Sequence, residues 1–168
     1  TSNYTTSVAI YDGENILKNC KKLLPVKDGE RGLRQSDAVF YHTNQLADVF
    51  DEALDSFNGK LDAIAVSSRP RDVEGSYMPC FTVGVNSARI LAKALKVPLY
   101  TVLHQAGHIT AALYSAKKLE LMNEKFIAFH VSGGTTEALL VQKGTENPLD
   151  IEIIAKTLRS EEHTSELQ

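Results

Sequence analysis

The sequence predicts an α/β protein in which two segments, one near each end, resemble each other. Apolar stretches of strand length alternate with stretches in which apolar residues recur at helical spacing. In addition, residues 5–24, "TTSVAIYDGENILKNCKKLL", resemble residues 135–158, "TTEALLVQKG…DIEIIAKTL". Each segment opens with paired threonines, forms an apolar strand, turns and returns as a second strand. The alternatives are a chance likeness of two hairpins and a duplicated unit, in which a strand meander precedes alternating helices and strands.

In the first half of the chain, "SVAIYDG" and "ENILKNCKKLLP" are predicted strands joined through Asp12-Gly13, a pair typical of tight turns. A helix is expected from Ser36 to Phe57, and Asn58-Gly59 is its stop signal. Its apolar residues recur at helical spacing and are Val39, Phe40, Leu46, Val49, Phe50 and Leu54. The segment "LDAIAVSS" is a short apolar strand of the buried type.

In the second half, "CFTVGVNSARILAKAL" is a predicted helix that Gly84 weakens, and "VPLYTVL" is the next strand. A further helix, which carries two histidines, is expected to run to about Leu121. Three consecutive strands follow: "KFIAFHVSGG", "TTEALLVQKG" and "DIEIIAKTL". His130, inside the first of these strands, is expected to be structural.

Composition restricts the cellular setting and the partners. The chain has 168 residues, of which 43% are hydrophobic and 23% charged, which suits one domain or one and a fraction. Its net charge of −3 provides no overall basic surface for nucleic acid, so contact with RNA would need a local patch or a partner protein. The two cysteines match no metal or disulfide pattern, and the sequence shows neither a signal peptide nor an apolar run of membrane length. A cytoplasmic location is therefore expected.

Both ends look cut. The chain starts in a predicted turn without an initiator methionine, and "RSEEHTSELQ" has no apolar period. We expect residues 1–122 to form a first domain that lacks its first strand. Residues 123–158 would begin a second domain, and residues 159–168 would be a non-native or disordered tail.

The stretch "TVLHQAGHITAALY" places His104 and His108 four residues apart at the start of a predicted helix. Histidines at i and i+4 share one helix face, about 6 Å apart at Cβ, so both rings could reach one metal ion. A pair on the helix surface without a ligand is the alternative.

The duplicated arrangement resembles the RNase H-like architecture of the actin-like ATPase (ASKHA) superfamily, which includes actin, sugar kinases and Hsp70. The resemblance implies an RNase H-like first domain followed by the opening strands of a truncated second copy. In that superfamily, the turns of the two opening hairpins bind phosphate through backbone N–H groups. "TSNYTTS" and "VSGGTTE" would be those turns here. The second would provide a phosphate site from Ser132, Gly133, Gly134, Thr135 and Thr136.

Four motifs, in order, resemble the tRNA N6-threonylcarbamoyladenosine transferase family (TsaD-like, with the older label O-sialoglycoprotein endopeptidase). They are "DAIAVSSRP", "VGVNSARILAKAL", "LHQAGHITAALY" and "VSGGTT". The resemblance implies that His104 and His108 bind one Fe²⁺ or Zn²⁺, with an aspartate outside this chain as third ligand. It also implies transfer of a threonylcarbamoyl group from threonylcarbamoyl-adenylate to N6 of the adenosine beside the tRNA anticodon. Partner proteins and homologous pathway subunits would help to recruit the tRNA, and no membrane is involved.

The sequence also departs from the family pattern. Ser36 stands where the family has glutamate, and Thr135 replaces the loop histidine. His42 falls on a family histidine, although a surface or half-buried position is the expectation from its helix. These departures keep a second function open, a non-catalytic paralogue that binds nucleotide and a partner homologue. A metallopeptidase is the third alternative, but Gln105, Ala106 and Gly107 between the two histidines include no acid or base.

The chain by itself is expected to be inactive, because a metal ligand and the cleft between two domains would be missing. Strand edges around Phe126–Val141 are expected to be unpaired and to promote aggregation.

Overall fold

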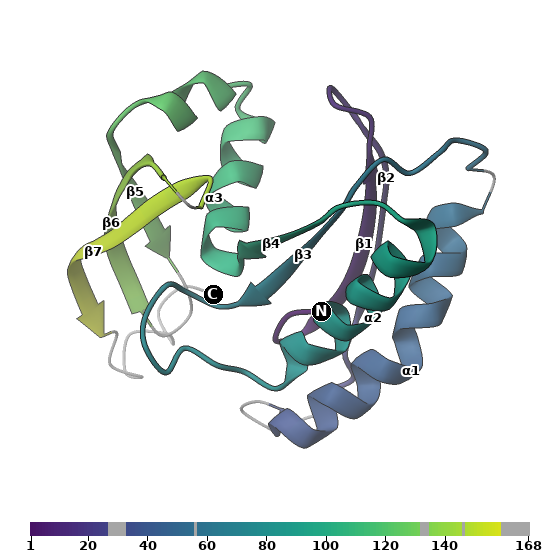
Figure 1. Ribbon diagram of the computed structural model, residues 1–168. Helices are drawn as coiled ribbons and strands as arrows, with labels where there is room; N and C mark the ends of the chain where they lie inside the picture. Colours follow the sequence, from purple (N-terminus) through teal and green to yellow (C-terminus); the bar gives the residue numbers. More distant parts are fainter. Residues whose placement is uncertain (27–32, 56, 132–134, 146, 159–168) are drawn as a thin grey trace, which may run out of the picture. The chain divides into compact units, whose positions relative to one another are not determined.

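The computed structural model describes residues 1–26, 33–55, 57–131, 135–145 and 147–158 (Figure 1). The chain divides into two compact units, Thr1–His104 and Gln105–Gln168. Both units are mixtures of helix and short sheets, so the predicted α/β class is confirmed. The expected domain boundary after residue 122 stays a prediction.

The first unit opens with a hairpin of β1 (Thr5–Tyr11) and β2 (Ile16–Leu23), which pair antiparallel. The Asp12 carboxylate accepts hydrogen bonds from the N–H groups of Glu14 at 2.8 Å and Asn15 at 2.7 Å. These donors lower the pKa of Asp12, because they stabilise its charged form. Gly13 has φ of 103°, a value that favours glycine. The predicted turn at Asp12-Gly13 is therefore confirmed.

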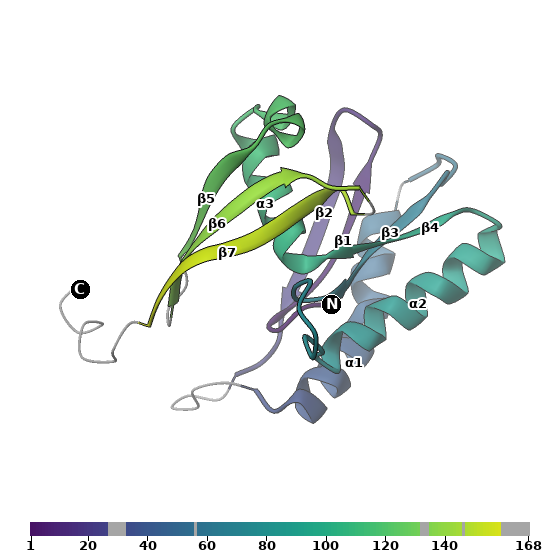
Figure 2. The same cartoon turned by 60° about the vertical axis from the view of Figure 1, so that its left-hand side comes forward.

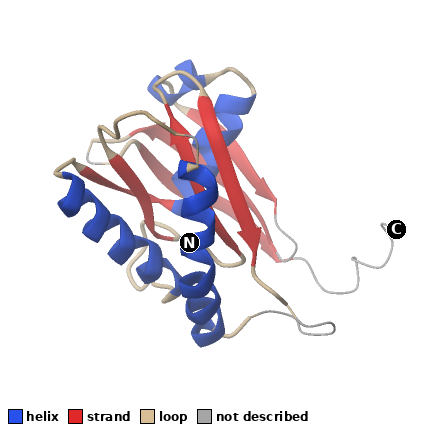
Figure 3. Cartoon of the chain, turned by 90° about the vertical axis from the view of Figure 1, so that its right-hand side faces the viewer, coloured by secondary structure: helices blue, strands red, loops and turns tan. Residues whose placement is uncertain are grey.

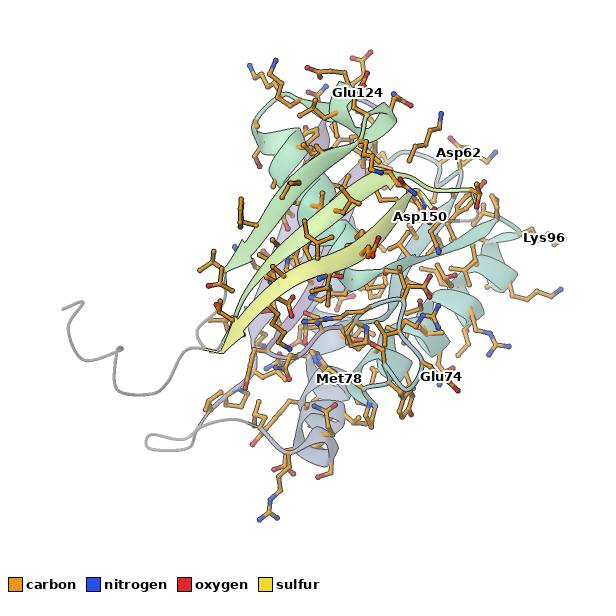
Figure 4. All side chains as sticks on the ribbon, turned by 90° about the vertical axis from the view of Figure 1, so that its left-hand side faces the viewer. Asp62, Glu74, Met78, Lys96, Glu124 and Asp150 are labelled. Atoms are coloured by element: carbon orange, nitrogen blue, oxygen red, sulfur yellow. The ribbon has the colours of Figure 1, made fainter. Side chains whose placement is uncertain are left out.

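Two helices lie on one side of the strands of this unit (Figure 3). They are α1 (Gln35–Leu54) and α2 (Cys80–Leu95). The bounds of α2 are as predicted, whereas α1 ends at Leu54, before the predicted end at Phe57. Gly84 of α2 has a packing role, since its N–H donates to Thr1 Oγ1 at 3.0 Å. A Cβ at this position would come within 2.8 Å of the same oxygen, so a larger residue here would displace the Thr1 side chain. The helix ends where Lys96, marked in Figure 4, adopts φ of 57°.

The strands β3 (Ile64–Arg69) and β4 (Leu99–Leu103) pair parallel and form a sheet separate from β1–β2. A hollow of about 190 Å³ lies between the two sheets. It is lined by Ser7–Ile10 of β1, Ile64–Val66 of β3 and apolar side chains of α1 and α2. Two short sheets thus face one hollow without pairing with each other.

The second unit contains most of α3 (His104–Ser115), a 3₁₀ turn η1 (Leu119–Asn123) and three strands. The strands β5 (Phe126–Val131), β6 (Thr135–Lys143) and β7 (Leu149–Leu158) form an antiparallel sheet in the order β5-β6-β7 (Figure 2). The three predicted strands are confirmed. The β6–β7 hairpin also matches the β1–β2 hairpin, because each begins at paired threonines and returns antiparallel.

The expected end of the third helix near Leu121 is wrong. Lys117 adopts φ of 56°, and its N–H donates to the Tyr114 carbonyl at 3.0 Å. The N–H of Lys118 donates to the Leu113 carbonyl at 2.8 Å. These two bonds form a Schellman motif, which terminates a helix even though the apolar spacing continues beyond it.

In the described part of the chain, no helix is long and apolar enough to cross a membrane. Cys20 and Cys80 are buried free thiols, and burial raises the pKa of both. On the sheet of the second unit, Ile127, Phe129 and Val131 are exposed large apolar residues. The expectation of unpaired strand edges around Phe126–Val141 is wrong for β6, which pairs with β5 on one side and β7 on the other; among the described residues β5 pairs only with β6. The expected tendency of this region to aggregate stays a prediction.

A core substitution tests the packing of the first unit. Phe81 is 2% exposed and packs with Leu24, Ala38 and Cys80. Phe81→Ala should lower the free energy of unfolding by about 3–5 kcal/mol, because it leaves a cavity. Phe40→Ala, at a residue 60% exposed on α1, should cost about 1 kcal/mol or less. Urea denaturation followed by circular dichroism measures both, and equal losses would contradict the assigned core.

Candidate functional site

The chain passes from β4 directly into α3, and this junction places the two predicted metal ligands. His104 is the first residue of α3, and His108 follows one helical turn later. The His104 ring makes an edge contact with Phe81, with ring centres 5.5 Å apart and planes inclined by 69°. The aromatic contact restricts the orientation of His104, and the helix puts both histidines on one face.

His108 stacks on a histidine that the sequence did not associate with it. Its ring centre lies 6.2 Å from that of His130 on β5, and the ring planes are inclined by 22°. Burial lowers the pKa of His108, and the neighbouring His130 lowers it further. A lowered pKa favours the neutral imidazole, which is the form that binds metals.

Glu137 is a second residue of this region that the sequence analysis missed. It lies directly opposite His130 in the β5–β6 register and is fully buried. Its Oε2 lies 3.5 Å from Nδ1 of His130, and its Oε1 lies 3.6 Å from Nζ of Lys156 on β7. A buried carboxylate is stable only when it is paired, and these two basic groups provide partners.

A hollow of about 190 Å³ in the second unit is bordered by α3 on one side and by β5 and β6 on the other. Polar side chains enter its lining at three positions: Gln105, His108 and His130. Gln105 is 8% exposed, and its Nε2 has no hydrogen-bond partner within the part of the chain that the structure describes. Buried amide donors are normally satisfied, so Gln105 is an exception among the described residues.

The predicted metal site is only partly represented in the chain. Among the described residues, no group of three His, Cys, Asp or Glu side chains could hold a metal ion. The two imidazoles of α3 are nonetheless donors that iron and zinc both accept. The donor set therefore fits the expected metal in kind and needs further ligands to complete it.

The predicted phosphate site lies largely outside the described residues, which exclude 132–134, that is Ser132, Gly133 and Gly134. Thr135 begins β6, and Thr136 lies opposite Val131 in the register of β5 and β6. The roles assigned to these five residues stay predictions.

The expectation of a surface or half-buried His42 is wrong, because its side chain is completely buried. Its Nε2 lies 2.5 Å from the Ser2 carbonyl oxygen, which can only accept, so this nitrogen carries the proton. In the neutral ring, Nδ1 then accepts from the Thr6 hydroxyl at 2.8 Å. Both nitrogens are used to fasten α1 to β1 and to the start of the chain. Ser36, which stands where the family has glutamate, is exposed at the beginning of α1.

The fold and the site define a class: an α/β protein in which a histidine pair opens a helix after a parallel strand. Comparison with known proteins narrows that class. The family model described as tRNA N6-adenosine threonylcarbamoyltransferase (TsaD) matches residues 27–161, and the chain belongs to this family.

Individual relatives agree with the family match. A Staphylococcus saprophyticus protein named tRNA N6-adenosine threonylcarbamoyltransferase is 35% identical over 158 residues, which cover 90% of this chain and 42% of the relative. Relatives with the same name come from Borreliella burgdorferi and Methanopyrus kandleri. The Borreliella burgdorferi protein is 35% identical, and the match covers 89% of this chain and 40% of the relative. The Methanopyrus kandleri protein is 30% identical, and the match covers 79% of this chain and 37% of the relative. The chain thus spans about two fifths of the length of the curated relatives it matches.

The buried His42 predicts a pH dependence of stability. Burial lowers its pKa below the ordinary value of 6.5, against the opposing effect of the Ser2 hydrogen bond. The unfolded chain therefore binds the proton first. The stability that neutral His42 provides is present above pH 6.5 and is lost as the pH falls through the folded-state pKa.

Melting temperatures between pH 7.5 and pH 5 test this dependence. One extra proton in the unfolded state gives a slope of at most about 1.4 kcal/mol per pH unit. His42→Gln, which keeps an N–H donor, should flatten the profile. His108, whose pKa is also lowered, would leave a residual slope. An unchanged profile in His42→Gln would show that His42 does not titrate in this way.

Proposed function

We propose that the protein to which this chain belongs transfers a threonylcarbamoyl group from threonylcarbamoyl-adenylate to N6 of the adenosine beside the tRNA anticodon. The observation that carries the proposal is the His104–His108 pair on α3 in a chain of this family. The relatives' name, tRNA N6-adenosine threonylcarbamoyltransferase, supports the substrate class.

The proposal gives each part of the site a task. His104 and His108 would hold one Fe²⁺ or Zn²⁺, with a third ligand outside this chain. The ion would act as a Lewis acid on the reactive carbonyl or phosphate group. Ser132–Thr136 would bind the adenylate phosphate through backbone N–H groups. Phe81, in edge contact with His104, would keep that ring in place.

We also propose that the two units are RNase H-like, as in the ASKHA superfamily. The hollow between the separate sheets β1–β2 and β3–β4 supports this arrangement. One further strand between β1 and β3 would join them into a single five-stranded sheet. The matching β1–β2 and β6–β7 hairpins support a duplicated unit.

The chain on its own should be inactive in this scheme, because it spans about two fifths of its relatives' length. Its net charge of −3 favours recruitment of tRNA through partner proteins and homologous pathway subunits. A non-catalytic paralogue is the second candidate, and the departures at Ser36 and Thr135 favour it.

Metal and nucleotide binding test the proposed site. The longest naturally encoded protein that contains this sequence should bind close to one equivalent of iron or zinc. The double substitution His104→Ala/His108→Ala should abolish that metal together with tight binding of an adenylate analogue, because both ligands on α3 are removed. Elemental analysis and calorimetry measure the two quantities. A wild-type protein without metal and nucleotide would contradict the transferase.

Activity separates the two candidates. When it is supplied with threonylcarbamoyl-adenylate, tRNA and pathway subunits, the longest naturally encoded protein should form the modified nucleoside. Mass spectrometry of digested tRNA detects this nucleoside. The 168-residue chain should form at least about 1000-fold less, since removing parts of a catalytic unit costs several powers of ten. Metal and nucleotide binding without product from the long protein would favour the paralogue.

A further inference from the structure

The hollow of the first unit lies along two strand edges. Within the described ranges, β1 pairs only with β2, and β3 pairs only with β4. The hollow is lined by residues 7–10 of β1 and residues 64–66 of β3, and none of the described residues that line it belongs to β2 or β4. Successive side chains of a strand point to opposite faces, so a cavity over one face would be lined by alternate residues instead. The unpaired N–H and C=O groups of β1 and β3 therefore border the hollow.

The side of the hollow that the helices cover is apolar. Val8 packs against the core cluster that contains Val49 of α1, and Ile10, on the same face of β1, is 6% exposed. The helices add apolar side chains to the lining: Leu46, Phe50, Leu54, Ala88 and Leu91. A strand that entered the hollow would bury one of its faces here, at alternate residues.

The second unit shows how such a strand would pair. Its β6–β7 hairpin matches β1–β2 at equivalent positions, since Thr5 pairs with Leu23 and Thr135 pairs with Leu158. The other edge of β6 is taken by β5, which runs antiparallel to it. The equivalent edge of β1 borders the hollow. A strand equivalent to β5 would therefore run antiparallel to β1.

The same match gives a register. Val131, the last residue of β5, stands four positions before Thr135, as Thr1 stands four positions before Thr5. Thr1 lines the hollow, as a residue equivalent to Val131 should. The strand that fills the hollow would therefore end beside Thr1.

The side-chain pattern of β5 fits the helix-covered side of the hollow. The β5–β6 register, applied to β1, places the equivalents of Ile127 and Phe129 opposite Ile10 and Val8. Ile127 and Phe129 are the exposed apolar side chains of β5, at 54% and 73%. A strand with this alternation would bury two apolar side chains against α1 and α2.

We propose that the hollow between β1 and β3 is a binding site for one extended peptide segment of the same protein that lies outside these 168 residues. The segment runs antiparallel to β1, and its apolar side chains lie opposite Val8 and Ile10. In such strand addition, main-chain hydrogen bonds give affinity, and pockets for alternate side chains give specificity. The inference rests on the RNase H-like arrangement under the proposed function, and it adds the direction, register and side-chain pattern of the bound strand.

A peptide supplied to the 168-residue chain tests the site. The probe is "KFIAFH", the sequence of residues 125–130, preceded by added lysines and a fluorescent label. Fluorescence anisotropy should show saturable binding of one peptide per chain. The peptide with Ile127→Ser and Phe129→Ser should bind at least about tenfold more weakly, because two apolar side chains are no longer buried. No binding, or equal binding of both peptides, would overturn the proposal.

Filling the hollow from the protein side gives a matched pair of variants. Ala88 of α2 is 6% exposed and lines the hollow, whereas Ala94 of the same helix is exposed and does not. Ala88→Leu should weaken peptide binding at least about tenfold, because the added atoms occupy the site; Ala94→Leu should change it less than about twofold. Circular dichroism shows whether each variant folds, and the peptide pair decides the question if Ala88→Leu does not.

Disulfide exchange tests the direction of the strand. A peptide with His130→Cys should cross-link to the chain with Ser7→Cys at least about tenfold faster than to the chain with Tyr11→Cys, because only directly opposite residues are close enough. Mass spectrometry measures the two rates, and the native cysteines are buried. Faster cross-linking to Tyr11→Cys would mean parallel insertion and overturn the proposed direction.

These measurements use neither metal, nucleotide nor tRNA. Absence of peptide binding would therefore overturn the strand site and leave the proposed roles of His104 and His108 untouched. Absence of metal and nucleotide binding would overturn the transferase and leave a measured peptide complex standing. A chain that elutes as a stable dimer and does not bind the peptide would assign the hollow to a second copy and overturn the proposal.

Discussion

In the second unit, the pleat of β5 turns Phe126, Ala128 and His130 toward the same hollow as α3, because alternate side chains of a strand share one face. The antiparallel register then sets Glu137 of β6 opposite His130. Lys156 of β7 lies opposite Glu137 in turn. A shift of one residue in either pairing would move these groups to the other face and separate the charges. The stacked histidines and the buried carboxylate therefore depend on strand register.

In the first unit, hydrogen bonds between polar groups connect the helices to β1 and to the start of the chain. Thr1 Oγ1 donates to the Cys80 carbonyl and accepts from Gly84, which ties the start of the chain to α2. His42 ties α1 to Thr6 of β1 and to the Ser2 carbonyl. The bond between Thr6 and His42 is buried and the other three are partly buried, so breaking the first would leave a buried polar group unpaired. They hold the helices over two sheets that do not pair with each other.

The start of α3 and the hollow beside His108 both bear on the proposed function. Family membership and the position of His104 and His108 after β4 are the two observations on which the proposed transferase rests. The surroundings of His108 add His130, Glu137 and Gln105, which come from three different elements.

The sequence by itself determined the order and type of the elements, the turn at Asp12-Gly13, the bounds of α2 and the position of the histidine pair. These features depend on local periodicity and turn chemistry, which nearby residues specify. The end of α3 was predicted too late, because a Schellman motif with a lysine at positive φ leaves no clear signal in the sequence. Only the tertiary structure decided the burial of His42 and the meeting of His108 with His130 and Glu137. Those contacts join residues that lie up to 40 positions apart, so packing and strand register, rather than local pattern, bring them together.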